Sequence, residues 1–138
     1  MNVFSDFYSR VQNAQRVGDS LVILPWTHKA WRFALTLKRL KYIEDFKILS
    51  TSLEGQKYLP RNYFKKEIPK ISIQLIPGGF SYLRQVSKPS RRVIRKAKEI
   101  KLHPKPYGSF ILSTNLGLLT CHEAKTMNIG GELMCEIY

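Results

Sequence analysis

The sequence predicts an α+β protein with two small domains, an N-terminal α-β-α-β-β domain at residues 1–76 and a C-terminal, mainly β domain at residues 77–138. The N-terminal part alternates between helical spacing of apolar residues and short apolar runs, which is typical of mixed α and β structure. Pro77-Gly78-Gly79 is the strongest break in the chain. With 138 residues and 43% hydrophobic composition, the chain is long and apolar enough for a packed core.

The N-terminal domain is expected to open with a helix and a buried strand. Apolar residues at helical spacing predict a helix that Asn2 can cap and Gly18 can end. The run Leu21–Leu24 is apolar throughout and is closed by Pro25, which indicates a buried strand.

A second helix and two strands complete this domain. Thr27 can cap a helix that extends to about Tyr42, and basic residues near its end complement the helix dipole. Strand signals follow at residues 43–49 and 71–76. The polar residues 50–69 between them are predicted to form a long hairpin connection.

The C-terminal domain is expected to hold short strands around one short helix. Thr120 and Glu123 have the spacing of a capping box, so a helix should begin there, and Asn128 can adopt the left-handed conformation that closes it. Strands are predicted at residues 110–112, 118–119 and 132–138.

The charge of the chain points to a polyanionic partner. There are 23 Lys+Arg and 10 Asp+Glu residues, so the formal net charge is +13. The excess is concentrated at residues 61–100, which hold eleven basic and two acidic residues, whereas residues 101–138 are neutral overall. A solvated charged surface is one interpretation of the densest part, residues 84–98. Because no acidic run lies nearby to neutralise it, a phosphate-facing surface is favoured.

Several function classes are disfavoured. No apolar run approaches the ~18 residues of a membrane-spanning helix, and the N-terminus has no targeting pattern. The two cysteines, Cys121 and Cys135, are predicted to be small packed residues in a reducing compartment. The three histidines lie in different segments, and no metal-ligand spacing, phosphate-binding loop or acid–base pair is present. We therefore expect no catalytic residue, metal, cofactor or small-molecule substrate.

One polar segment, Ser113-Thr114-Asn115-Leu116-Gly117, lies between two apolar strands and carries three hydrogen-bonding side chains in succession. Asn and Gly are favoured in hairpin turns, so ordinary turn chemistry is one interpretation. A binding loop is the other. Nine residues separate Thr120 from the run Gly130-Gly131-Glu132-Leu133-Met134-Cys135.

This arrangement resembles the C-terminal signature of the universal small-subunit ribosomal protein family known as S-eight. Three further segments resemble blocks of the same family, and all four occur in the family's order: Asp6–Ala14, Tyr42–Phe46 and Arg84–Arg92 precede the signature. Only residues 50–70 lack clear counterparts, so the similarity extends over nearly the whole chain.

The resemblance implies a protein that binds the central domain of small-subunit ribosomal RNA directly, supports subunit assembly and translation, and contacts neighbouring ribosomal proteins. Hydroxyl, amide and carboxylate groups would contact bases and 2′-hydroxyls in the shallow minor groove of RNA, and cations would hold phosphates. Two adjacent glycines would allow the backbone to come close to the RNA. The implied RNA-binding residues are Ser9, Arg10, Asn13, Thr27, Lys29, Lys88, Arg91, Arg92, Arg95, Ser113, Thr114, Asn115, Gly130, Gly131 and Glu132.

The chain departs from the family pattern at Gln12, Ser90, Ile94, Asn115 and Asn128, where the family has Arg, Gly, Tyr, a hydroxyl residue and Gly. Such drift at RNA-facing positions favours an organellar ribosome. The start of the chain aligns with the start of the family, which leaves no room for a presequence. We therefore expect a mitochondrion-encoded protein in the mitochondrial matrix, with a plastid stroma or a bacterial cytoplasm as alternatives.

Two other function classes stay open at this point. A free-standing RNA-binding protein or RNA chaperone would depend on Arg91 and Arg92 but be indifferent to changes at residues 113–115. An enzyme acting on a polyanion would lose turnover when His122 or Glu123 is changed.

Overall fold

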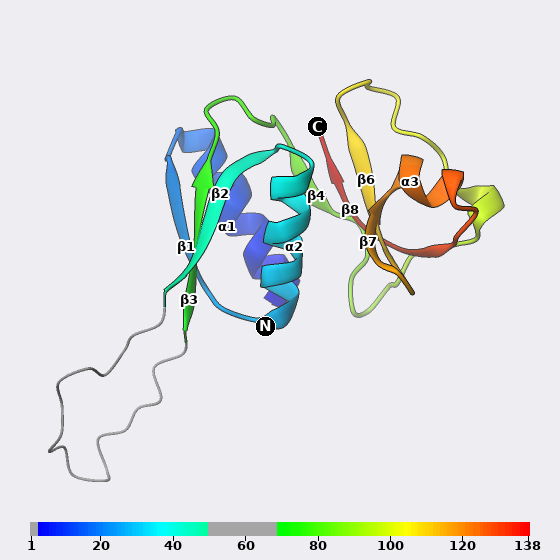
Figure 1. Ribbon diagram of the computed structural model, residues 1–138, viewed down its shortest axis with the longest axis horizontal. Coiled ribbons are helices and arrows are strands. Elements are labelled where there is room, and N and C mark those ends of the chain that lie inside the picture. Colours follow the sequence, from blue (N-terminus) through cyan, green and yellow to red (C-terminus); the bar gives the residue numbers. More distant parts are fainter. Residues whose placement is uncertain (1–2, 50–68) are drawn as a thin grey trace, which may run out of the picture.

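The computed structural model describes residues 3–49 and 69–138. It contains two antiparallel sheets, and Figure 1 shows two long helices, α1 and α2, between them. Helices combined with two antiparallel sheets confirm the predicted α+β class. The predicted connection at residues 50–69 lies outside the described residues except for residue 69.

The N-terminal sheet packs α1 (Val3–Val17) and α2 (His28–Arg39) on one face (Figure 1). Its strands β1 (Leu21–Pro25), β2 (Ile43–Leu49) and β3 (Lys70–Leu75) are antiparallel in the order β1-β3-β2. Alternate residues of β1 and β3 are buried, because successive side chains of a strand point to opposite faces. The predicted order α-β-α-β-β is confirmed.

The C-terminal sheet is built around the last strand, β8 (Gly131–Ile137). On one side β8 pairs with β6 (Ser109–Thr114), which pairs in turn with β7 (Gly117–Thr120). On its other side, β8 pairs with two short strands that the sequence did not predict. These are β4 (Leu83–Gln85) and β5 (Ile94–Arg95).

Two short helical segments complete this half, α3 (Cys121–Thr126) and the 3-10 turn η2 (Ala97–Glu99). The predicted capping box of α3 is confirmed. The Thr120 hydroxyl accepts from the amide of Glu123, and the amide of Thr120 donates to the Glu123 carboxylate, both at 3.2 Å.

The helix ends show where local sequence signals work and where they fail. Gly18 and Asn128 follow α1 and α3 with φ angles of 87° and 55°, as predicted. The predicted extension of α2 to Tyr42 is wrong, because the helix ends at Arg39. Lys41 adopts a φ of 63°, and the amide of Tyr42 donates to the carbonyl of Leu37 at 3.0 Å, which is a Schellman ending. Lys41 is neither Gly nor Asn, so nothing local announces this stop.

The main hydrophobic core extends through both sheets and the helices between them. Its fully buried members include Val11 and Phe33 of the helices, Ile73 of β3, and Ile111 and Cys135 of β6 and β8. A smaller cluster lies under α3. Burial raises the pKa of the Cys135 thiol to about 12, so this thiol is neutral and serves as a small packed residue, as the sequence predicted.

Candidate nucleic-acid interface

The polar segment 113–117 forms the tip of the β6–β7 hairpin. The Thr114 hydroxyl donates to the carbonyl of Gly117 at 2.9 Å and accepts from the amide of Leu116 at 3.2 Å. Gly117 has a φ of 107°, a conformation that favours glycine. Thr114 therefore follows the turn interpretation. Within the described residues, the side chains of Ser113 and Asn115 make no hydrogen bond, so their polar groups are available to a partner.

A second tight turn joins β4 to β5, and we call residues 86–93 the basic hairpin. At its tip the amide of Lys88 donates to the carbonyl of Arg91 at 3.0 Å, and the amide of Arg91 donates back at 2.9 Å. Pro89 stands at the position where its fixed φ suits a turn. Ser90 has no positive φ, so this turn does not need the glycine that the resembling family carries there.

The base of the basic hairpin is tied to β8 through Ser87. Its side chain is buried, donates to the Glu132 carboxylate at 2.6 Å and accepts from the amide of Val93 at 3.1 Å. The second carboxylate oxygen of Glu132 makes no hydrogen bond within the described residues. Ser87 therefore orients Glu132 and leaves it with acceptor capacity.

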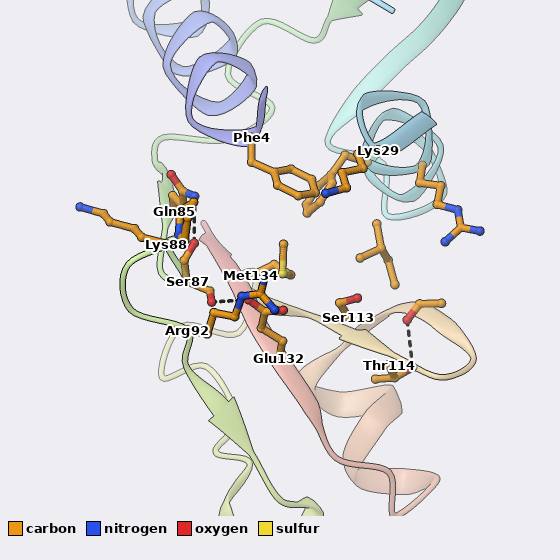
Figure 2. A pocket seen from close by; sticks show the side chains of 15 residues that line it. Phe4, Lys29, Gln85, Ser87, Lys88, Arg92, Ser113, Thr114, Glu132 and Met134 are labelled. Carbon is orange, nitrogen blue, oxygen red and sulfur yellow. Dashed lines mark hydrogen bonds between the residues drawn. The ribbon is translucent and has the colours of Figure 1, made fainter. Parts of the chain in front are cut away.

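These segments border a groove of about 360 Å³ between the helices and the C-terminal sheet, which we call the central groove (Figure 2). Four cations line it: Lys29, Arg32, Lys88 and Arg92. Its polar lining consists of Gln85, Ser87, Ser113, Thr114 and Glu132. Apolar surface comes from Phe4, Phe33, Pro89, Leu118 and Met134. Cations, short hydroxyls, one carboxylate and apolar faces together suit a partner that carries phosphates, sugar hydroxyls and flat bases.

The walls of the central groove are held together by side chains from distant parts of the chain. Arg39 at the end of α2 binds both carboxylate oxygens of Glu123, at 2.7 and 3.2 Å, and also donates to the carbonyl of Leu118. At the other wall, the Ser5 hydroxyl donates to the side-chain oxygen of Gln85 at 2.7 Å. These links join the helices to the C-terminal sheet, alongside the hydrophobic core that the two share.

The structure brings six of the predicted RNA-binding residues to the central groove: Lys29, Lys88, Arg92, Ser113, Thr114 and Glu132. Lys29 also lies over the ring of Phe4, with 5.1 Å from its ammonium nitrogen to the ring centroid. Asn115 is exposed at the hairpin tip but does not line the groove. Residues from both halves of the chain thus meet at one surface.

The predicted residues of the first helix lie elsewhere. Ser9, Arg10 and Asn13 are exposed on α1, and helical geometry places them roughly opposite Phe4, which lines the groove. Arg10 is paired with Asp6 at 2.9 Å. Thr27 caps α2 by accepting from the amide of Ala30 at 3.1 Å. An RNA contact by these residues would have to come from outside the central groove.

Gly130 and Gly131 allow close approach within the protein itself. A Cβ on Gly131 would overlap the carbonyl oxygen of Ser113 in β6, and one on Gly130 would lie 2.7 Å from the carbonyl oxygen of Arg95. The sequence expectation was a close approach of RNA. In the structure, both glycines allow neighbouring strands to pack closely, next to the tip of the β6–β7 hairpin (residues 113–117), which we call the polar tip.

Sequence reasoning missed several residues of the central groove. Arg32 follows Lys29 by three residues on α2, a spacing that puts both on the same side of a helix, so this signal was available. Phe4, Gln85 and Ser87 reach the groove through tertiary packing that no local pattern announces. Among residues 3–49 and 69–138, no group of three His, Cys, Asp or Glu is placed to hold a metal ion. In the same ranges, no helix has the length and apolarity needed to cross a membrane.

The fold and the central groove define a strongly basic α+β protein whose polar and cationic surface suits a polyanion. The family model described as ribosomal protein S8 matches residues 2–138. The chain belongs to this family, and it is therefore a structural protein of the small ribosomal subunit and not an enzyme.

Individual relatives are similar to this chain over nearly their full length. Small ribosomal subunit protein uS8c of Helicosporidium sp. subsp. Simulium jonesii is 37% identical, with 98% of this chain and 95% of the relative covered. Small ribosomal subunit protein uS8 of Persephonella marina is 34% identical, with 97% and 96% covered. The uS8 protein of Dichelobacter nodosus is 31% identical, with 99% and 98% covered.

Proposed function

We propose that this chain binds the central domain of small-subunit ribosomal RNA directly, and that this binding supports subunit assembly and translation alongside neighbouring ribosomal proteins. Residues 77–138 would form the RNA-binding domain, and residues 1–76 would supply the helical wall of the central groove. The observation that carries the proposal is the lining of that groove, where Ser113 and Glu132 lie among four cations.

Each kind of group in the groove has a separate task in this proposal. Lys29, Lys88 and Arg92 hold phosphates, which gives affinity without reading sequence. Ser113 in the groove, and Asn115 at the exposed hairpin tip beside it, bond to base edges or 2′-hydroxyls, which short side chains can reach in the shallow minor groove of RNA. Glu132, oriented by Ser87, accepts from a base amino group or a sugar hydroxyl, since a carboxylate would be repelled by phosphates. The remaining predicted residues, Arg91 and Arg95 among them, add phosphate contacts.

The test compares binding to an isolated central-domain fragment with binding to an unrelated RNA duplex. We expect tighter binding to the fragment, with a steep loss of affinity as salt rises. The double variant Ser113→Ala/Asn115→Ala should weaken binding to the fragment by about 1–3 kcal/mol and leave binding to the duplex unchanged. Equal affinity of the unaltered protein for both RNAs would contradict specific recognition.

A free-standing RNA-binding protein or RNA chaperone predicts a different pattern. Both RNAs would lose affinity when Arg91 and Arg92 are changed, and neither would respond to Ser113→Ala/Asn115→Ala. Co-sedimentation with small ribosomal subunits at raised salt distinguishes the two hypotheses: a ribosomal protein stays with the subunits, whereas a free-standing RNA-binding protein does not.

We also propose that the ribosome in question is mitochondrial. The support is the drift from the family pattern at Gln12, Ser90, Ile94 and Asn115, which lie in or near the predicted RNA-facing segments. Fractionation of the source cells, with immunodetection of the chain in mitochondrial, plastid and cytosolic ribosomes, tests this. Detection in plastid or bacterial ribosomes would replace the mitochondrial assignment.

A further inference from the structure

A second groove lies on the other face of the basic hairpin. Successive side chains of an extended segment point to opposite faces. Ser87 and Arg92 line the central groove, whereas their neighbours Val86 and Val93 line the second groove. Gln85 and Lys88 line both. The hairpin therefore lies between two grooves that meet at Gln85 and Lys88.

This second surface, which we call the cationic groove, has a volume of about 440 Å³ and a different chemistry. Its cations are Arg84, Lys88, Arg91 and Arg95. Its floor is apolar and consists of Val86, Val93 and Leu133. The side-chain amide of Gln85 also lines it, but its oxygen accepts from the Ser5 hydroxyl and its nitrogen donates to the carbonyl of Ser87. No carboxylate and no hydroxyl lines this groove, in contrast to the central groove. Lys88 borders both grooves, and Figure 2 shows its side chain extending away from Ser113 and Thr114, so it can hold a phosphate at the boundary between them.

The charges of the cationic groove are nearly uncompensated. Arg84 has Glu136 at 3.6 Å, but the arginine side chain is 58% exposed, so this pair is weak. Within the described ranges, Lys88, Arg91 and Arg95 form no ion pair, and Arg95 donates only to the carbonyl of Ile94. Like charges gathered around one groove repel each other unless an anion lies between them. The arrangement favours a ligand with several closely spaced negative charges.

We propose that the cationic groove binds the phosphate backbone of a second RNA segment, distinct from the segment in the central groove, so that the basic hairpin lies between two RNA strands. This inference rests on the proposed function. RNA is the polyanion that a small-subunit ribosomal protein meets, and a groove with cations but no hydroxyl or carboxylate can hold phosphates without reading bases. The protein would thereby join two parts of the RNA, one read in the central groove and one only held.

The test uses the full chain with Arg84→Gln/Arg91→Gln/Arg95→Gln. The charge-matched control is Lys98→Gln/Lys101→Gln/Lys125→Gln, whose lysines are exposed and line neither groove. A second variant, Arg91→Gln/Arg95→Gln, keeps the pair between Arg84 and Glu136 in case the triple variant lowers the Tm. Hydroxyl-radical footprinting on the complete central-domain RNA shows which nucleotides each protein protects.

We expect the unaltered protein and the control to protect two separate RNA segments. The groove variants should lose protection of one segment and keep the other. The slope of log K against log salt should fall by about 2–3 for three lost phosphate contacts, and by much less for the control.

Three outcomes would overturn the inference while leaving the proposed function intact. The groove variants could protect both segments as before, or lose both segments in step, which would indicate a single binding surface. They could also bind RNA normally yet fail to enter assembled subunits, which would indicate an acidic protein partner in the cationic groove. The proposed function itself fails on a different result, namely equal affinity of the unaltered protein for the central-domain fragment and an unrelated duplex.

Discussion

Two hairpin tips border the central groove, and they are closed by different means. The β6–β7 tip is closed by a side chain, since the Thr114 hydroxyl bonds both the carbonyl of Gly117 and the amide of Leu116. The basic hairpin is closed by its backbone, through the paired amides and carbonyls of Lys88 and Arg91. In the first tip, one side chain that was predicted to bind RNA also builds the turn. In the second, the charged side chains take no part in closure.

In the basic hairpin, the side chains proposed to bind RNA make no contribution to the fold of the described residues. In the polar tip, Thr114 was predicted to bind RNA and also stabilises the turn. Substitutions of exposed arginines should change binding without unfolding the protein, because no described bond of the hairpin fold depends on their side chains. Substitutions next to the polar tip should change stability first. The predictions below use this contrast.

The largest effect is expected at Gly131, next to the polar tip. Gly131→Ala adds a Cβ that would overlap the carbonyl oxygen of Ser113, so β6 and β8 must move apart or bend. We expect a loss of about 1–3 kcal/mol in the free energy of unfolding, measured by urea denaturation. Asn115→Ala, at the exposed tip of the β6–β7 hairpin, is the control and should stay within about 0.5 kcal/mol. An unchanged urea midpoint for Gly131→Ala would show that β6 and β8 can move apart to accommodate the added methyl group without loss of stability.

Thr114 should show the coupling most directly. Thr114→Val removes both side-chain hydrogen bonds of the turn, and we expect a loss of about 1–2 kcal/mol in the free energy of unfolding. Thr114→Ser keeps the hydroxyl and should retain most of that stability. Full stability of Thr114→Val together with weakened RNA binding would instead make the hydroxyl a recognition group and not a turn group.

The two tips also differ in how well the sequence predicted them. Asn115 and Gly117 announce a turn locally, and Thr120 with Glu123 announces the following helix, so both were predicted and are present. β4 and β5 were missed because each pairs with β8 across dozens of residues, and no local alternation marks such short strands. The central groove was predicted in part for the same reason. Lys29 and Ser113 stand in recognisable motifs, whereas Gln85 joins the groove only through the packing of β4 against α1.

The basic hairpin should respond in binding and not in stability. Arg92→Gln is expected to change the free energy of unfolding by less than about 0.5 kcal/mol. Binding to the central-domain fragment should weaken, and the slope of log K against log salt should fall by about 0.7–0.9 as one phosphate contact is lost. Lys98→Gln, an exposed charge change outside both grooves, serves as the control. A lower Tm for Arg92→Gln would show that the Arg92 side chain stabilises the fold, which would contradict the expected difference between the two hairpin tips.

The smallest effect is expected at Ser90, where the resembling family carries glycine. Because Ser90 has no positive φ, glycine brings no relief of strain and only increases the freedom of the unfolded chain. Ser90→Gly should therefore lower the free energy of unfolding by about 0.5 kcal/mol and leave RNA affinity unchanged, whereas Ser90→Ala should be neutral. Thermal unfolding of the three proteins under one condition measures the difference. A higher Tm for Ser90→Gly would mean that the serine is strained, and that closure of the basic hairpin depends on this side chain after all.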